Sequence, residues 1–268
     1  MTILPCTTVQ IINRTGNFIL KIFLLLSVFI FFTGCLNVSA QPGQPVPVKN
    51  NSKIWEEKDY ARVSLSNFRK EPLFLETINF TSIDYPRLHA SIFYATNEIR
   101  VSHKLKELGY NANLEIAAYN HSKRMVEKNF FSHQDSTDRT RYNPGDRAKL
   151  AGVTNPSIAE NIAETFAIQY KAGTSVYPLS TPGEFSYTNR GKPIPPHTYL
   201  SFADEVLTMW MNSSGHRANI LSTNGLELGC GAYFYQDKSF YQMAKFKATQ
   251  NFQWYKKVIP GEVSDPTP

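Results

Sequence analysis

The residues best suited to chemistry in this sequence are two histidines and a glutamate that lie far apart along the chain, His133, Glu160 and His216. Two imidazoles and a carboxylate are a ligand set suited to a catalytic zinc ion, with one coordination position left for water. The same groups could act without metal, with a histidine as general base oriented by Glu160. They could equally form a buried hydrogen-bonded network, because buried polar groups need partners. All three interpretations stay open at this point.

Other reactive side chains carry less weight. His89, His103 and His121 fall in segments with helical periodicity and His197 falls in a proline-rich stretch, so we expect surface or satisfied core residues. Cys230 lies in an apolar β-like stretch, which favours buried packing over nucleophilic catalysis. The sequence contains neither His-Glu-x-x-His nor Gly-x-Ser-x-Gly, which argues against the enzyme classes that use those motifs.

The segment Ser201–Leu221 must position His216. Ser201 followed by Asp204 is typical of a helix start, and an apolar face recurs at helical spacing through Ala203, Val206, Leu207 and Trp210. The polar run 212–215 ends that helix, because Asn, Ser and Gly favour turns. His216 is therefore predicted to begin a second short helix, with its side chain directed into a cleft.

Helices are also predicted in the first half of the chain. One begins at Asp84-Tyr85-Pro86 and ends at Gly109, and another runs from Asn113 to about Asn129, just before Phe130-Phe131-Ser132-His133. A short helix is expected over 146–151, ended by Gly152, and a further one over 158–169 carrying Glu160.

The second half contains a long irregular segment and a β-hairpin. Residues 171–199 are rich in proline, glycine and tyrosine and are predicted to form an insertion, which is functional or disordered in most proteins. Apolar residues then alternate along two strands, at Leu228, Cys230, Ala232 and Phe234 and again at Phe246, Ala248, Gln250 and Phe252. Helices followed by a hairpin predict an α+β layered domain.

The N-terminus is predicted to be an export signal. Lys21 precedes the apolar run 22–32, which is too short to span a bilayer comfortably but suits a signal peptide. Thr33-Gly34-Cys35 resembles the bacterial lipoprotein signal, with Phe32 where leucine is usual, so we favour cleavage after residue 34 and lipidation of Cys35. Ordinary cleavage after Val38-Ser39-Ala40 and a retained anchor are the alternatives.

The predicted organisation is a signal peptide at 1–34, a lipidated N-terminus with tether and arm at 35–84, a domain at 85–255 and a tail at 256–268. Only Cys230 remains in the domain, so no disulfide within the domain can stabilise it and it depends on its core. The formal charge of +6 is spread out, apart from Lys256-Lys257, which argues against nucleic acid as the partner.

Six fragments, in this order, resemble the bacterial branch of the CAP superfamily, the cysteine-rich secretory, antigen and pathogenesis-related proteins. They are Asn97-Glu98-Ile99-Arg100, Phe130-Phe131-Ser132-His133, Asp146-Arg147-Ala148, Ala159-Glu160-Asn161-Ile162-Ala163, Trp210 with 214–221, and Thr249-Gln250-Asn251-Phe252. The resemblance covers roughly 85–255 and implies a three-layer α-β-α sandwich.

The resemblance also implies a cleft of two histidines and two glutamates. His133 and Glu160 match it directly, and His216 lies near the place of the second glutamate of eukaryotic members. The fourth member is unassigned, and Glu205 is the nearest acid on the preceding helix. Ala159 replaces the usual glycine, and no histidine precedes Thr249-Gln250.

We therefore predict an exported, lipid-anchored CAP-domain protein whose cleft binds a lipid or another small molecule. The alternatives are a hydrolase, assisted by zinc or dependent on His and Glu alone, and a cell-envelope interaction module that uses the insertion at 171–199. The tyrosines of that insertion either line an apolar groove or pack within the loop. The membrane, through Cys35, is the expected partner.

Overall fold

A four-stranded sheet forms the centre of the molecule in the computed structural model, which describes residues 54–254. The strands lie in the order β1 (Gly109–Tyr110), β5 (Glu227–Asp237), β6 (Met243–Gln253) and β2 (Ile158–Phe166). β5 and β6 form the predicted antiparallel hairpin, with Ala232 opposite Ala248. β2 pairs antiparallel with β6, which places Glu160 opposite Asn251.

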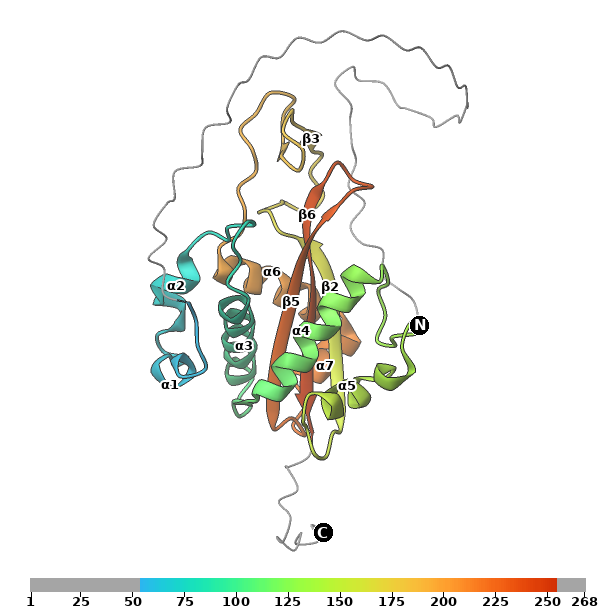
Figure 1. Ribbon diagram of the computed structural model, residues 1–268. Helices are drawn as coiled ribbons and strands as arrows, with labels where there is room; N and C mark the ends of the chain where they lie inside the picture. The colour runs from blue at the N-terminus through green and yellow to red at the C-terminus, as the bar shows by residue number, and fades with distance from the viewer. Residues whose placement is uncertain (1–53, 255–268) are drawn as a thin grey trace, which may run out of the picture.

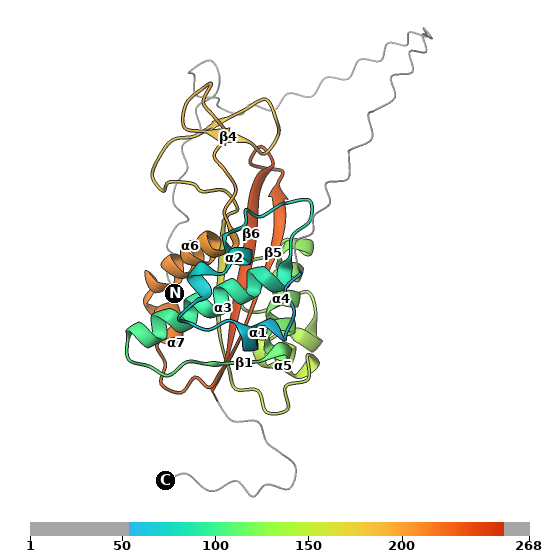
Figure 2. The ribbon, with the colours of Figure 1, turned by 90° about the vertical axis from the view of Figure 1, so that its left-hand side faces the viewer.

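Helices cover both faces of this sheet (Figures 1 and 2). α4 (Ala112–Glu127) and α5 (Pro144–Leu150) lie on one face, and α3 (Tyr85–Ser102), α6 (Tyr199–Met211) and α7 (Ser214–Ile220) lie on the other. The predicted α+β class and three-layer α-β-α sandwich are confirmed. Between residues 54 and 254, none of the helices is long and apolar enough to cross a membrane.

The α3/α6 face of the sheet carries the main hydrophobic core. Side chains of alternate strand residues point to it, and they are fully or almost fully buried: Leu228, Cys230, Ala232, Phe246, Ala248 and Phe252. Trp210 of α6 packs in the same cluster and is 1% exposed. The predicted burial of Trp210 and Cys230 is confirmed.

The α4 face is built differently. A Cβ added to Gly229 or Gly231 would lie 2.1 Å from the backbone nitrogen of Glu115 or of Tyr119, so only glycine lets α4 lie this close to β5. On the neighbouring strands the residues that point to this face are largely polar and include Glu160, Thr249 and Asn251.

Two predicted elements are corrected by the structure. Residues 158–166 form the strand β2, so the predicted helix over 158–169 is wrong. β2 pairs with β6 and is covered on both faces, so its side chains are buried in an unbroken run from Ala159 to Ala163 that hides the strand periodicity. α6 begins at Tyr199 with Thr198 as its N-cap, and Ser201 lies inside the first turn, where its side chain completes the capping box.

The ends of α3, α4 and α5 differ from the predicted helix boundaries by a few residues. α3 begins as predicted after Asp84, whose side chain accepts from Arg87 N–H, but ends at Ser102, and Gly109 belongs to β1. α4 is capped by Asn111, and α5 begins at Pro144 rather than Asp146. Gly152, at a φ of 100°, follows α5 as expected.

The insertion folds on its own small apolar cluster. Its strands β3 (Tyr177–Pro178) and β4 (Phe185–Ser186) pair with each other, and Val176, Phe185 and Ile194 pack against Met243. Tyr170 packs against this cluster while Tyr187 is 37% exposed. Tyr199 belongs to α6 and the main core. Internal packing thus accounts for part of the tyrosine content.

The segment 54–83 is an integral part of the fold, and the domain therefore begins before residue 85. It forms α1 (Asp59–Arg62), a 3-10 turn η1 (Phe68–Lys70) and α2 (Pro72–Leu75), and it buries Trp55, Phe68 and Phe74 against α3. The predicted leader, the lipidation at Cys35, the tether and the C-terminal tail concern residues outside 54–254.

Candidate functional site

Glu160 is the centre of the polar network on the α4 face. Its side chain is 1% exposed, and each of its oxygens has a donor. Oε1 accepts from His133 Nδ1 at 2.9 Å, and Oε2 accepts from Arg147 Nη2 at 2.8 Å. With its amide oriented to satisfy both of its ends, Asn251 also donates to Oε2 at 3.1 Å. The carboxylate is thus held by three donors.

These donors keep Glu160 ionised. Burial raises the pKa of Glu160, but the hydrogen bond from His133 and the charge of Arg147 lower it by more than burial raises it. The net effect is a pKa below the ordinary value of a glutamate. Arg147 is itself buried and fixes the neighbouring backbone, since it donates to the carbonyl of His133 at 3.0 Å and to those of Arg141 and Tyr142.

His133 is the outward end of this network, with 35% of its side chain exposed. Because a carboxylate only accepts hydrogen bonds, Nδ1 of His133 must carry the proton that binds Glu160. In the neutral ring Nε2 then keeps its lone pair. That nitrogen can accept a hydrogen bond from a ligand, take a proton or bind a metal ion.

His216 comes from the other side of the sheet. It lies in the first turn of α7, which contacts β2, and it is half-buried. Burial and then the charge of His133 lower its pKa. The structure bonds His133 to Glu160 of β2, the edge strand of the sheet, and it bonds the backbone carbonyl of His216 to the next residue of that strand, Asn161. That the two imidazoles face each other stays a prediction.

His121 also belongs to this network, although the sequence pattern pointed to no role for it. It is fully buried on α4, its Nε2 donates to the carbonyl of Ser132 at 3.0 Å, and the same nitrogen lies 3.9 Å from Glu160 Oε1. Burial lowers its pKa to about 4, so the ring is neutral near pH 7. Its Nδ1 has no hydrogen-bond partner among the described residues.

The donor set does not match a three-ligand metal site. Between residues 54 and 254 no group of three or more His, Cys, Asp or Glu side chains is placed to hold a metal ion. Both oxygens of Glu160 are already engaged, so Glu160 fits the role of a carboxylate that orients His133 better than that of a ligand. Zinc stays a prediction, with His133 and His216 as the residues that would hold it.

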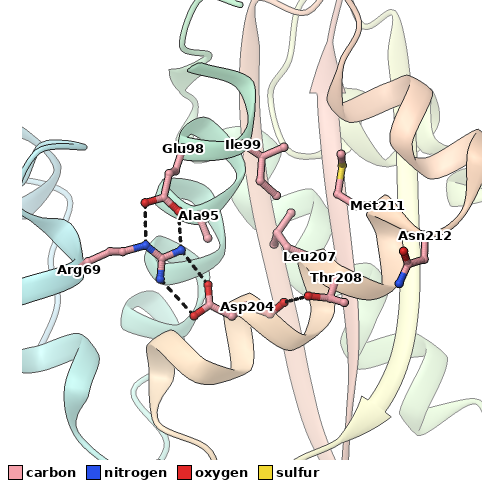
Figure 3. A pocket seen from close by; sticks show the side chains of 9 residues that line it. All are labelled: Arg69, Ala95, Glu98, Ile99, Asp204, Leu207, Thr208, Met211 and Asn212. Atoms are coloured by element: carbon pink, nitrogen blue, oxygen red, sulfur yellow. Dashed lines mark hydrogen bonds and ion pairs between the residues drawn. The ribbon is translucent and has the colours of Figure 1, made fainter. Parts of the chain in front are cut away.

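Glu205 is not bonded to the site. It lies half-buried on α6, where burial raises its pKa, and in the described part of the chain no hydrogen bond or ion pair joins it to His133, Glu160 or His216. A cavity of about 460 Å³ lies elsewhere, between α3 and α6 (Figure 3). Its lining includes Ile99, Leu207 and Met211, and Arg69 bridges Glu98 and Asp204 beside it.

Two features of the sequence bear on the network residues for which no role is predicted. His121 shares a helical face with buried apolar residues, and a histidine on such a face needs a polar partner. Arg147, Asn161 and Asn251 each stand in one of the fragments that carry the family resemblance. Neither feature indicates which atoms meet, because the segments are distant in sequence.

Comparison with known proteins places this chain in a family. The model of the cysteine-rich secretory protein family, CAP, matches residues 93–252. The uncharacterized protein YkwD of Bacillus subtilis is 27% identical over 198 residues, which are 73% of this chain and 62% of that protein. The chain thus spans less than two thirds of that relative.

Three solved structures are also similar to this chain. An extracellular protein of Bacillus anthracis that contains an SCP domain is 28% identical, with a TM-score of 0.44 over 65% of this chain and 42% of the other. A cysteine-rich secretory protein of Staphylococcus aureus is 18% identical, with a TM-score of 0.38 over 64% and 39%. An outer surface protein of Borrelia burgdorferi is 13% identical, with a TM-score of 0.39 over 61% and 90%.

Proposed function

The chain belongs to the CAP family, and we propose that it is an exported protein that binds a small ligand between His133 and His216 at the edge of β2. The observation that carries the proposal is the fully engaged Glu160, a buried carboxylate whose network ends in one partly exposed imidazole. Burying a charge is costly unless it is paired, so a buried charge aimed at a surface histidine indicates a functional site.

The chemistry of the two imidazoles limits the ligand. Burial and then His133 lower the pKa of His216, which favours its neutral form. Neutral imidazoles accept hydrogen bonds from hydroxyl and amide groups and bind borderline metal ions. A lipid or other small molecule with a polar hydroxyl or amide group, or a zinc ion, fits these two nitrogens.

The test is to identify what the protein carries. Full-length protein is purified from its own cells and analysed by mass spectrometry for bound molecules and by elemental analysis for metal. A ligand present in the wild type and lost in both His133→Ala and His216→Ala supports the proposal. His103→Ala is the control, because His103 is an exposed residue that caps the end of α3. A ligand retained by both site variants contradicts it.

Hydrolysis is the second candidate, and the 2.9 Å bond between His133 Nδ1 and Glu160 favours it. An imidazole oriented by a carboxylate is the arrangement of a general base that activates water. A panel of ester and amide substrates tests this reading. Activity lost in both His133→Ala and Glu160→Gln supports it, and activity that survives either substitution removes it.

Anchoring through a lipid on Cys35 is part of the proposal. The sequence around Cys35 resembles a lipoprotein signal, and Trp55 is the first buried residue in the part of the chain that the structure describes, so about 20 residues separate the two. Cys35→Ala should release the protein from membranes or leave its leader uncleaved. Mature wild-type protein that begins at Gln41 would contradict lipidation.

A further inference from the structure

Residues 160 and 161 of β2 point to opposite faces of the sheet, because successive strand residues alternate. Glu160 meets Arg147 of α5 on the α4 face, whereas Asn161 meets α7 on the other. Glu160 holds His133. We propose that Asn161 is the matching positioning residue for His216, so that one edge strand holds both imidazoles. The inference rests on the proposed pairing of these histidines.

The contacts of Asn161 are directed at α7. Its side chain is fully buried, and Nδ2 donates to the carbonyl of His216 at 3.1 Å and to Gln250 Oε1 at 3.1 Å. Its Oδ1 accepts from Asn219 Nδ2 at 2.9 Å, and Asn219 also donates to the carbonyl of Glu160 at 3.3 Å. Asn161 thus bonds both the residue that carries the imidazole and the helical turn after it.

The support behind Asn161 is rigid. Gln250 is fully buried on β6, and its Nε2 donates to Thr96 Oγ1 at 2.7 Å. The hydroxyl of Thr96 donates in turn to the carbonyl of Ile92 within α3, at 2.6 Å. A continuous chain of hydrogen bonds therefore runs from α3 through β6 and β2 to α7, and Asn161 is its last side chain before His216.

Apolar packing alone does not fix the first turn of α7, which carries His216. Ile220 is the one buried residue of the helix, and it lies at the end opposite His216. That end is also held by Arg100, whose Nη1 donates to the carbonyl of Ile220 at 2.6 Å. The first turn, with His216, therefore depends on the amide of Asn161.

The experiment compares Asn161→Ala with Asn97→Ala. Asn97 is also a buried amide, bonded at both ends to the backbone of Leu108, and neither bond involves α7. Both variants lose a buried amide, so a general loss of stability affects both. Two readouts report on His216 itself: the rate at which diethyl pyrocarbonate modifies it, followed by mass spectrometry, and hydrogen exchange across 214–220.

We expect Asn161→Ala to raise the modification rate of His216 and the exchange of α7 severalfold, and Asn97→Ala to change neither. Zn²⁺ affinity, measured by calorimetry, should fall by about tenfold or more in Asn161→Ala only, as for other residues that orient a ligand. Unchanged modification and exchange in a folded Asn161→Ala protein would overturn the assignment. If wild-type protein binds no Zn²⁺, the metal reading fails, while modification and exchange still decide the role of Asn161.

Discussion

The two faces of the central sheet have different roles, although the same strands form both. On the α3/α6 face, β5 and β6 present mainly apolar side chains, interrupted by the buried Gln250, and these side chains form one cluster with Trp210. On the α4 face, the same strands present glycine, threonine and asparagine, and β2 adds Glu160. The apolar face supplies most of the burial, which lets the other face keep a buried charge. The main apolar core and the buried charge of Glu160 are thus separated by one layer of backbone.

The largest expected effect is on the apolar face. Trp210→Ala should lower the free energy of unfolding by about 3–5 kcal/mol, the usual range for a buried aromatic residue. Chemical denaturation measures this, and the geometry of the His133–Glu160 pair should persist in the protein that remains folded. A loss below about 1 kcal/mol would show that the core does not depend on this face.

Breaking the ion pair between Arg147 and Glu160 on the α4 face should lower the free energy of unfolding by a somewhat smaller amount. Arg147→Met leaves Glu160 buried without its cation, and we expect a loss of about 3 kcal/mol, the lower end for a broken buried pair, because His133 and Asn251 still bond the carboxylate. The double variant Arg147→Met/Glu160→Gln should recover part of that loss. No recovery in the double variant would mean that the charge of Glu160 is not what Arg147 compensates.

Zinc binding tests the partly exposed residues of the site, His133 and His216, whose packing contributes little to the stability of the fold. If zinc binds between His133 and His216, an ion present at about a hundred times its dissociation constant adds about 2.7 kcal/mol of stability. For a domain of this size the melting temperature should rise by roughly 5–10 °C. His216→Ala should abolish the rise without unfolding the protein. A rise of equal size in that variant would place the ion elsewhere.

The smallest effect concerns two buried neutral histidines, His121 and His197. Burial lowers the pKa of each to about 4, whereas an unfolded histidine titrates near its ordinary value of about 6.5. As the pH falls below about 6.5 the unfolded chain binds protons that the folded chain does not, so stability decreases down to about pH 4 and is unaffected above about 6.5.

Each histidine should contribute a loss of about 2 kcal/mol between about pH 7 and pH 5. Denaturation at a series of pH values measures it. His197→Gln retains a partner for Ser201 and should reduce the dependence by that amount, whereas His103→Gln, at an exposed position, should not. If the pH dependence of stability were the same in His197→Gln as in the wild type, burial would not lower the pKa of His197 in the folded protein.

The two faces also differ in how far the sequence predicts them. The alternation from Leu228 to Phe234 and the helical face with Trp210 are local patterns, and both predictions are confirmed. The prediction of a helix at β2 is wrong because this strand is buried on both faces, so Glu160 and Asn161 lie within a run without alternation.

The bonds of the site depend on contacts that the sequence alone does not reveal. Arg147 reaches Glu160 across 13 residues and Asn161 reaches His216 across 55, and neither separation has a local signature. His121 joins the network only because α4 lies close to the glycines of β5. The fragments that resemble the family contain Arg147, Asn161 and Asn251, but only the folded structure shows which atoms these side chains bond.

The most direct test of the account asks whether His133 and His216 bind one ion together. A Cu²⁺–iminodiacetate complex is added below stoichiometry to protein in a His103→Ala background, and pulsed EPR counts the imidazole nitrogens bound to copper. The account predicts two nitrogens, reduced to one by His133→Ala and by His216→Ala. A single nitrogen, unchanged by either substitution, would contradict the convergence of the two histidines at β2.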